Sequence, residues 1–206
     1  MKRWSGNATE AGLQPALSIS PRVESRWRKA MDAFPESLRE ESLQKLSADG
    51  KNRVRGRRVG IDITWVTDRI GVGGGIWNAD NMAGVARAGV THIIDMQIEF
   101  DDTPLAVAHG IAVCWNPVDD DFEPKGPEIF RRGVDFGLAA LEKNEAKVLI
   151  HCAAGVHRAP MMTLALLGVM GWTLEDAMDL IETRRPAADF AEVYVRSVEE
   201  FLELRE

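Results

Sequence analysis

The sequence is poor in the residues from which cross-linked or metal-held folds are built. Its 206 residues include two cysteines, Cys114 and Cys152, and four histidines. Two cysteines cannot form a disulfide framework, and together with four histidines they leave little for a structural zinc cage. We therefore expect a fold that is held by an apolar core.

Long apolar runs are also missing. The most apolar stretch, Met161–Trp172, has twelve residues, among them a threonine and two glycines. This stretch is too short for a membrane span and predicts a buried helix. No apolar segment follows the basic residues at the start of the sequence, so no secretory signal is evident. We expect a soluble, cytoplasmic protein.

The composition is that of a folded protein, with 45% hydrophobic and 28% charged residues, which excludes global disorder. The net charge of −7 hides an asymmetry. Residues 1–58 carry 13 Lys and Arg against 7 Asp and Glu, a balance of +6, whereas residues 59–206 carry 12 against 25, a balance of −13. Because the basic run Lys51–Arg58 lies at this step, we place a domain boundary between residues 56 and 57.

Residues 1–56 are interpreted as a helical N-terminal extension. Apolar residues recur at helical spacing from Trp27 to Phe34, and Pro35 starts or kinks a second helix that continues to Leu46. The alternative is a basic arm that binds nucleic acid or an anionic surface. Mixed-sign charge and an apolar stripe favour a pair of amphipathic helices, so no nucleic-acid partner is expected.

Residues 57–206 alternate between short β-type runs and helical segments. This alternation predicts an α/β fold, a mainly parallel central sheet with helices on both faces. Strands are expected at Val59–Val66, Arg69–Val72, His92–Met96, Ile111–Val118 and Lys147–His151, and helices at Asn78–Ala88, Pro104–His109, Pro127–Asn144, Pro160–Met170, Leu174–Arg185 and Phe190–Leu204.

The glycine run Gly71–Gly75 suggests a dinucleotide-binding loop at first sight. The run does not have the G-x-G-x-x-G spacing, and the acidic residue expected after a second strand has no clear counterpart. We interpret the run as a turn between a strand and the next helix.

The most informative segment surrounds Cys152. An apolar strand runs into His151 and Cys152, five residues follow, and then come Arg158 and a helix with Pro160 in its first turn. Backbone amides of such a loop can surround one phosphate, and the helix directs the positive end of its dipole at the same point. The residues of this phosphate-binding loop are Ala153, Ala154, Gly155, Val156 and His157.

Two side chains of this segment have the chemistry of phosphoryl transfer. A cysteine in an anion-binding loop at a helix N-terminus is expected to lose its proton readily and to act as a nucleophile. The planar guanidinium of Arg158 can bind two equatorial oxygens of a phosphoryl group. Cys152 could instead be a buried structural thiol, but the surrounding pattern favours the nucleophile.

The segment resembles the HCxxGxxR signature of the cysteine-dependent protein tyrosine phosphatases, in particular the dual-specificity branch. The resemblance covers about residues 59–206. Residues 65–74 look like the family's opening strand pair, residues 89–96 like its next strand, and the Arg-Pro at residues 185–186 like the end of a family helix. The resemblance implies a phosphomonoesterase that acts on phosphotyrosine, with or without phosphoserine and phosphothreonine.

The resemblance also implies a general acid on a loop before the long helix. Asp120 is the first choice and Asp121 the second, because three aspartates follow one another there. By resemblance, Cys152 forms a phosphocysteine, Arg158 holds the equatorial charge, and Asp120 protonates the leaving oxygen and later assists water. His151 would orient the loop by hydrogen bonding. No metal and no cofactor are implied.

Two positions depart from the family pattern. Most members have Ser or Thr directly after the arginine, where this chain has Ala159, and loss of that hydroxyl makes the sulfur a poorer leaving group in the second step. Plant phosphatases that act on phosphorylated glucan also have Arg-Ala-Pro here, but typically with glycine where this chain has His157. We expect His157 either to contact the substrate phosphate or a carboxylate such as Asp120, or to point to solvent.

Several functions are compatible with these residues. The leading hypothesis is a protein tyrosine or dual-specificity phosphatase, whose partner is a phosphorylated protein or another phosphomonoester. The alternatives are a phosphatase of phosphoglucan or another non-protein ester, and a pseudophosphatase that binds phosphate without turnover. A sulfur-transfer enzyme of the rhodanese type fits the five-residue spacing poorly. The balance of −13 disfavours polyphosphorylated substrates. The sequence indicates no oligomeric state.

Overall fold

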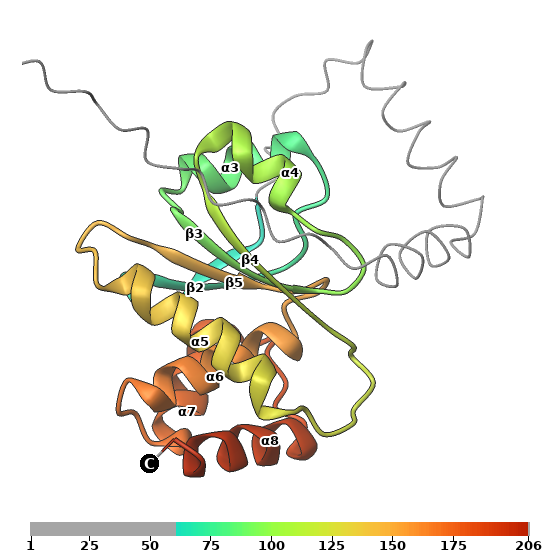
Figure 1. Ribbon diagram of the computed structural model, residues 1–206, viewed down its shortest axis with the longest axis vertical. Coiled ribbons are helices and arrows are strands. Elements are labelled where there is room, and N and C mark those ends of the chain that lie inside the picture. Colours follow the sequence, from blue (N-terminus) through green and yellow to red (C-terminus); the bar gives the residue numbers. More distant parts are fainter. Residues whose placement is uncertain (1–60, 206) are drawn as a thin grey trace, which may run out of the picture. The chain divides into compact units, whose positions relative to one another are not determined.

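The chain divides into two units, residues 1–55 and 56–206. The computed structural model describes residues 61–205, which belong to the second unit (Figure 1). The helical extension expected over residues 1–56 lies outside the described residues, as do the first two residues of the strand expected at Val59–Val66.

A five-stranded sheet forms the centre of the described part, with the strand order β1-β2-β5-β3-β4 (Figure 1). The pair β1 and β2 is antiparallel, whereas β2–β5, β5–β3 and β3–β4 are parallel. The expected mainly parallel sheet is therefore confirmed. The strands are β1 (Ile63–Trp65), β2 (Ile70–Gly73), β3 (His92–Gln97), β4 (Ala112–Val118) and β5 (Val148–His151).

Helices cover both faces of the sheet. In Figure 1 α3 and α4 lie above the sheet, and α5 to α8 lie below it. Helices α5 and α6 pack on the lower face, and α7 and α8 pack against α6. The helices are α3 (Ala79–Arg87), α4 (Thr103–Ala106) with the 3₁₀ turn Val107–His109, α5 (Pro127–Leu141), α6 (Arg158–Val169), α7 (Leu174–Arg184) and α8 (Glu192–Glu203).

Two apolar clusters lie on opposite faces of the sheet because successive strand residues point to opposite sides. Ile94 and Ile150 belong to the larger cluster, which includes α5, α6, α7 and α8. Their neighbours Ile93 and Leu149 belong to the smaller cluster with α3 and α4. The continuous apolar runs of β3 and β5 follow from this burial on both faces.

Helix α6 is the buried helix that the apolar run predicts. Every residue from Arg158 to Leu167 is buried. The helix begins two residues before the expected start at Pro160, which lies in the first turn where proline is tolerated. The end of the apolar run is different, because Met170 and Trp172 are exposed. Among the described residues, no helix is long and apolar enough to cross a membrane.

The carboxyl ends of β3, β4 and β5 lie at the same edge of the sheet, on the right in Figure 1. The strand register pairs His151, the last residue of β5, with Asp95 on β3 and with Gly73 on β2. Loops that follow parallel strands at such an edge form the usual binding crevice of α/β folds. The predicted phosphate-binding loop therefore follows β5 at this edge.

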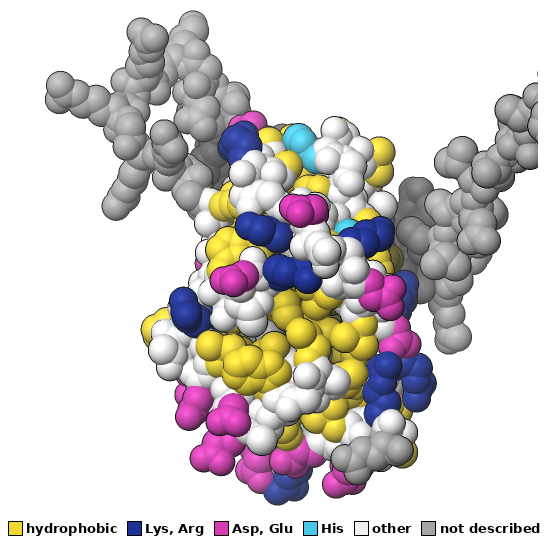
Figure 2. Space-filling model, turned by 90° about the vertical axis from the view of Figure 1, so that its left-hand side faces the viewer, with side chains coloured by type: hydrophobic (Ala, Val, Ile, Leu, Met, Phe, Trp, Pro, Cys, Tyr) yellow, Lys and Arg dark blue, Asp and Glu magenta, His cyan; other side chains and the backbone are white. Residues whose placement is uncertain are grey.

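Figure 2 shows the opposite side of the molecule, the left in Figure 1. Apolar surface lies in the middle of this view, and acidic side chains gather toward the lower end, where Figure 1 places α7 and α8. The exposed acidic residues of these two helices are Glu175, Asp176, Asp179, Glu182, Glu192, Glu199, Glu200 and Glu203. Part of the negative balance of residues 59–206 is therefore surface charge on α7 and α8.

The packing of α5 on α8 generates a stability prediction. The ring of Phe130 on α5 is fully buried, and its centroid lies 5.3 Å from that of Phe201 on α8. We expect Phe130→Ala to lower the free energy of unfolding by about 3–5 kcal/mol, because the truncation leaves a cavity. Denaturant titration measures the change. The control Leu204→Ala, on an exposed side chain, should cost less than about 0.5 kcal/mol. Equal losses would contradict the packing described here.

Candidate active site

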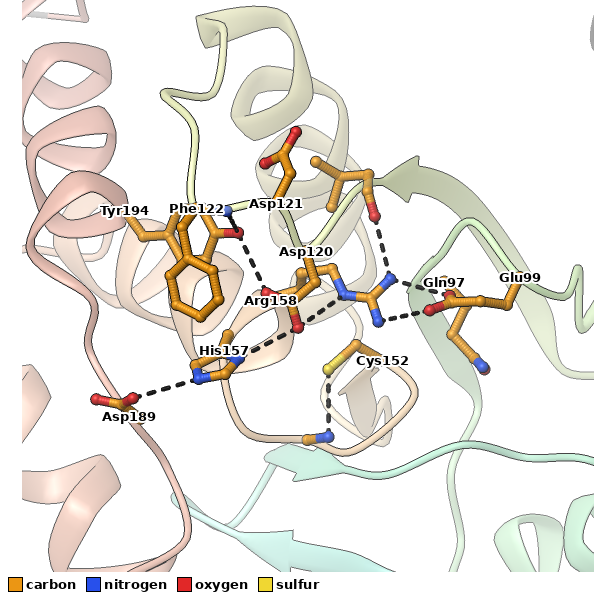
Figure 3. Close-up of polar contacts among 12 residues, drawn as sticks. Gln97, Glu99, Asp120, Asp121, Phe122, Cys152, His157, Arg158, Asp189 and Tyr194 are labelled. Carbon is orange, nitrogen blue, oxygen red and sulfur yellow. Dashed lines mark hydrogen bonds and ion pairs between the residues drawn. The ribbon is translucent and has the colours of Figure 1, made fainter.

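The loop of residues 152–157 joins β5 to α6 and surrounds the sulfur of Cys152 (Figure 3). Cys152 is buried, and its Sγ accepts a hydrogen bond from the backbone N–H of Gly155 at 3.2 Å. Helix α6 starts at Arg158, so its N-terminus directly follows this loop. The loop therefore combines the N–H of Gly155, which faces the sulfur, with the positive end of a helix dipole, as an anion site requires.

Gly155 allows the loop to lie close to the sheet. Its φ is +66°, and a Cβ atom there would lie 2.6 Å from the carbonyl oxygen of Gly73 and 2.3 Å from Nη2 of Arg185. Gly75 also contacts the loop, because its N–H donates to the carbonyl oxygen of Ala153 at 3.0 Å. The interpretation of the glycine run as a turn is wrong for Gly71–Gly73, which belong to β2, whereas Gly74 and Gly75 lie in the irregular segment between β2 and α3.

Arg185 supports the loop from behind. Its Nε donates to the carbonyl oxygen of Gly155 at 2.7 Å and its Nη2 to that of Ala154 at 3.2 Å. The other side of the guanidinium binds both carboxylate oxygens of Asp62, at 2.8 and 2.7 Å. Hydrogen bonds from Arg185 hold the pKa of Asp62 below its ordinary value. The Arg-Pro at the end of α7 is therefore a structural support of the phosphate-binding loop.

Arg158 is oriented by Glu99, which follows β3. Nη1 and Nη2 of Arg158 each donate to one carboxylate oxygen of Glu99 at 2.9 Å, and Nη1 also donates to the carbonyl oxygen of Val118 at 3.1 Å. Burial opposes ionisation of Glu99, but the hydrogen bonds from Arg158 outweigh it and lower the pKa of Glu99. Among the described residues, Nε of Arg158 has no hydrogen-bond partner. Glu99 thus holds one edge of the guanidinium and leaves Nε for a ligand oxygen.

Asp120 lies next to Arg158 and Asp121 does not. Oδ2 of Asp120 is 3.6 Å from Nε of Arg158 and 3.1 Å from Nδ1 of His157. Its Oδ1 accepts a hydrogen bond from the hydroxyl of Tyr194 at 3.2 Å. Asp121 is exposed and forms an ion pair with Lys125. Figure 3 shows the carboxylate of Asp121 pointing away from Cys152, so Asp120 is the better placed of the two candidate acids.

Phe122 and Tyr194 hold the loop that carries Asp120. Phe122 has a φ of +56°, which is unusual for a residue with a side chain. Its N–H donates to the hydroxyl oxygen of Tyr194 at 3.0 Å, and the two rings stack with centroids 5.8 Å apart. Burial and the neighbouring Asp120 raise the pKa of Tyr194 to about 12. The phenol therefore stays protonated and can donate to Asp120.

His151 lies behind the loop, in a buried cluster with Asp95 and Asp102. Its Nε2 is 2.9 Å from Oδ2 of Asp102 and 3.6 Å from Oδ1 of Asp95. Burial opposes a charged imidazole, but the contact with Asp102 and the charges of both carboxylates outweigh burial and raise the pKa of His151. These residues are also close enough together to bind a metal ion. The ion pair of His151 with Asp102 accounts for the arrangement by itself.

Ala159 is buried in the larger apolar cluster. Its carbonyl oxygen accepts a hydrogen bond from the hydroxyl of Thr163 at 2.8 Å. Alanine offers no hydroxyl to the sulfur, so the N–H of Gly155 is the donor that reaches Sγ of Cys152 among the described residues. This geometry agrees with the expectation that the sulfur lacks the side-chain donor of most family members.

The sequence reasoning missed the carboxylates and the tyrosine that hold the predicted residues in place. Three of these residues could have been predicted from their position in the sequence, because polar residues that follow a parallel strand gather at the binding edge of the sheet. That rule includes Glu99 and Asp102 after β3, and it would also have favoured Asp95 near the end of β3. The missed residues are Asp62, Asp95, Glu99, Asp102, Asp189 and Tyr194.

The geometry can be compared with known proteins. The family model described as "Dual specificity phosphatase, catalytic domain" matches residues 77–203. The chain belongs to the dual-specificity phosphatase family. This family lies within the cysteine-dependent protein tyrosine phosphatase superfamily, as the resemblance of the HCxxGxxR segment implies. The predicted α/β fold with a central sheet flanked by helices is therefore that of a known phosphatase domain.

Curated relatives match parts of the chain. It is 34% identical to Protein-tyrosine-phosphatase IBR5 of Arabidopsis thaliana over 65 residues, which are 31% of this chain and 25% of that protein. It is 29% identical to human Dual specificity protein phosphatase 5 over 113 residues, 54% of this chain and 28% of that protein. The chain thus spans about a quarter of the length of these two relatives.

Solved structures share the fold. The chain matches the crystal structure of Tk-PTP in the active form with a TM-score of 0.61 and 20% identity, covering 69% of this chain and 97% of that one. PTPMT1 in complex with PI(5)P gives 0.61 and 19%, over 69% and 95% of the two chains. DUSP15 gives 0.58 and 25%, over 69% and 88%.

The buried cluster behind the loop predicts a pH dependence of stability. Burial raises the pKa of Asp95 from 3.8 to about 7, and the pKa values of Asp102 and His151 are also raised. A raised pKa in the folded state means that stability is present at low pH and is lost as the pH rises through the folded-state value. We therefore expect this cluster to lower the free energy of unfolding between about pH 5 and pH 8.

Asp95→Asn tests this expectation, because an amide does not titrate. The decrease in unfolding free energy from about pH 5 to pH 8 should be smaller in Asp95→Asn than in the unsubstituted protein. The lowered pKa of His92 makes stability rise with pH, which opposes the effect of the cluster. The test therefore compares the pH dependence of Asp95→Asn with that of the unsubstituted protein. Asp119→Asn, on an exposed carboxylate, serves as control. Parallel pH curves for all three proteins would contradict the expectation.

Proposed function

We propose that this chain is a phosphomonoesterase that works through a phosphocysteine intermediate and acts on phosphotyrosine, phosphoserine or phosphothreonine in proteins. The observation that carries the proposal is the arrangement around Cys152. The anion-binding loop encloses the sulfur, Nε of Arg158 makes no hydrogen bond among the described residues, and Oδ2 of Asp120 lies 3.6 Å from that Nε. The nucleophilic sulfur of Cys152, the guanidinium of Arg158 and the carboxyl group of Asp120 therefore lie around one position.

In the first step the thiolate of Cys152 attacks phosphorus, and the ester P–O bond breaks as the P–S bond forms. The loop N–H groups and Nε of Arg158 stabilise the equatorial oxygens, whose charge is greatest in the transition state. Asp120 gives its proton to the leaving oxygen, which would otherwise depart as a poorly stabilised anion. The products of this step are phosphocysteine, the dephosphorylated alcohol and the carboxylate of Asp120.

In the second step a water molecule attacks phosphocysteine. The carboxylate of Asp120 takes a proton from the water, the P–O bond forms, and the P–S bond breaks. Phosphate leaves, and the thiolate of Cys152 and the acid form of Asp120 are restored. The N–H of Gly155 supports the departing sulfur, since it already donates to Sγ.

The charges around the loop favour a simple phosphomonoester over a polyphosphorylated ligand. Asp119, Asp121 and Glu123 are exposed on the segment that carries Asp120, and Asp189 is exposed beside His157. These carboxylates repel additional phosphates that lie outside the loop. The solved complex of PTPMT1 contains a phosphoinositide, but this acidic surrounding argues against such a ligand here.

A phosphorylated glucan is the second candidate substrate, and the exposed indole of Trp77 offers a surface for its sugar ring. Trp77 lies two residues after Gly75, which is hydrogen-bonded to the phosphate-binding loop, and its ring centroid is 6.4 Å from that of Phe100, the residue after Glu99. An aromatic face beside the loop can pack against a sugar ring as well as a tyrosine ring. Comparing turnover of phosphotyrosine peptides and phosphoglucan decides between the two substrates.

Substitution of the nucleophile and of the two candidate acids tests the mechanism. We expect Cys152→Ser to abolish phosphate release from 4-nitrophenyl phosphate. Asp120→Asn should slow hydrolysis of phenyl phosphate, a poor leaving group, by about 10²-fold or more, because its leaving oxygen depends on protonation. Asp121→Asn is the matched control and should change the rate by less than about threefold, since Asp121 faces Lys125. Lack of turnover by the unsubstituted protein would leave the pseudophosphatase as the function.

The position after Arg158 generates a separate prediction about the second step. In Ala159→Ser a hydroxyl is restored that can donate to the sulfur of Cys152, which makes the sulfur a better leaving group. We expect faster breakdown of the phosphoenzyme, by about tenfold to a hundredfold for one added hydrogen bond to a charged atom. Rapid-quench measurement of the phosphoenzyme checks this, and an unchanged breakdown rate would contradict it.

A further inference from the structure

His157 bridges two carboxylates on different segments of the chain. Its Nδ1 lies 3.1 Å from Oδ2 of Asp120 and its Nε2 lies 3.2 Å from Oδ2 of Asp189 (Figure 3). Asp120 precedes α5 and Asp189 precedes α8, whereas His157 is the last residue of the phosphate-binding loop. The imidazole therefore connects the loop that holds the phosphate to the residue proposed as general acid.

The two segments around His157 are themselves fixed. The backbone N–H of Asp189 donates to the carbonyl oxygen of Val156 at 2.8 Å, which places the Asp189 carboxylate beside the imidazole. The ring of Phe122 meets the imidazole edge-on with centroids 5.0 Å apart. Contacts with Asp120, Asp189 and Phe122 thus determine the orientation of the His157 imidazole.

The bridge also restricts where protons are placed. A neutral imidazole that donates from Nε2 to Asp189 presents a lone pair at Nδ1, and the matching state of Asp120 is then the acid, with its O–H donating to Nδ1. If Nδ1 carries the proton instead, it donates to the Asp120 carboxylate. In either state one proton lies between Nδ1 and Oδ2, the oxygen that is also next to Nε of Arg158.

We propose that His157, oriented by Asp189, is a positioning residue that fixes the Asp120 carboxyl and its proton beside the phosphate-binding loop. The proposal rests on the function proposed above, because it needs Asp120 as the general acid. His157 does not touch phosphorus in this arrangement, since both ring nitrogens face carboxylates. His157 affects the reaction through Asp120. Removing the imidazole should therefore lower the rate most when the leaving oxygen needs a proton.

Two amide substitutions separate the two contacts of the imidazole. The amide nitrogen of Asn can take the place of Nδ1 and contact Asp120, whereas that of Gln can take the place of Nε2 and contact Asp189. His157→Asn, His157→Gln and His157→Ala are compared with the unsubstituted full chain. For each, kcat/KM is measured with 4-nitrophenyl phosphate and with phenyl phosphate, because it reports the step in which the leaving oxygen departs, and thermal unfolding checks the fold.

We expect His157→Ala and His157→Gln to lower kcat/KM with phenyl phosphate about tenfold more than kcat/KM with 4-nitrophenyl phosphate. His157→Asn should restore most of the phenyl phosphate rate, because it retains a donor toward Asp120. Asp189→Asn, which lies outside the phosphate-binding loop, should show the same leaving-group dependence to a smaller degree. Val156→Ala is the control for a change within the loop and should slow both substrates by the same factor.

Equal losses with both leaving groups in His157→Ala, or equal behaviour of the Asn and Gln variants, would overturn the proposal. The first result would mean direct contact with the phosphate or a general distortion of the loop. Failure of the proposed function is recognised separately, because the unsubstituted protein would then release no phosphate from either substrate.

Discussion

The site depends on the close contact between the phosphate-binding loop and the end of β2. Gly155 adopts a left-handed backbone conformation, and a side chain there would collide with the carbonyl oxygen of Gly73 and with Arg185. The contact turns the loop back on itself, so that the N–H of Gly155 reaches the sulfur of Cys152. The helix dipole, the guanidinium of Arg158 and the general acid are all arranged around the position that this turn creates.

Carboxylates hold Arg158, Arg185 and His151 in place. Glu99 binds one edge of Arg158, Asp62 binds Arg185, and Asp102 contacts His151. Each pair is partly or fully buried, where removing one partner leaves an uncompensated charge and costs far more than an exposed pair would. Behind the loop, Asp95 and Asp102 both face the imidazole of His151, and burial raises the pKa of both carboxyl groups. Other carboxylates, those of Asp119, Asp121, Glu123 and Asp189, are exposed around the site and make its surroundings acidic, which bears on the choice of substrate.

Much of the fold could be predicted because its signals are local. Each expected strand and helix within the described residues is present, with ends that coincide or differ by up to three residues, apart from the first strand, which was expected from Val59 and begins at Ile63. Thr173, the N-cap of α7, accepts a hydrogen bond from the N–H of Asp176, the kind of local contact that marks a helix start in a sequence. Local patterns did not show that the glycine run contacts the phosphate-binding loop, since that contact joins residues about 80 positions apart in the chain.

The sequence by itself determined the loop between β5 and α6, its nucleophile and its arginine. These residues are contiguous, and the strand before them and the helix after them follow from local periodicity. Only the tertiary structure decided which of the many acidic residues meets which partner. Glu99 is 59 positions from Arg158, Asp120 is 37 from His157 and Asp62 is 123 from Arg185. Acidic residues look alike in a sequence, and the register of the parallel strands and the packing of α7 and α8 against α6 select among them.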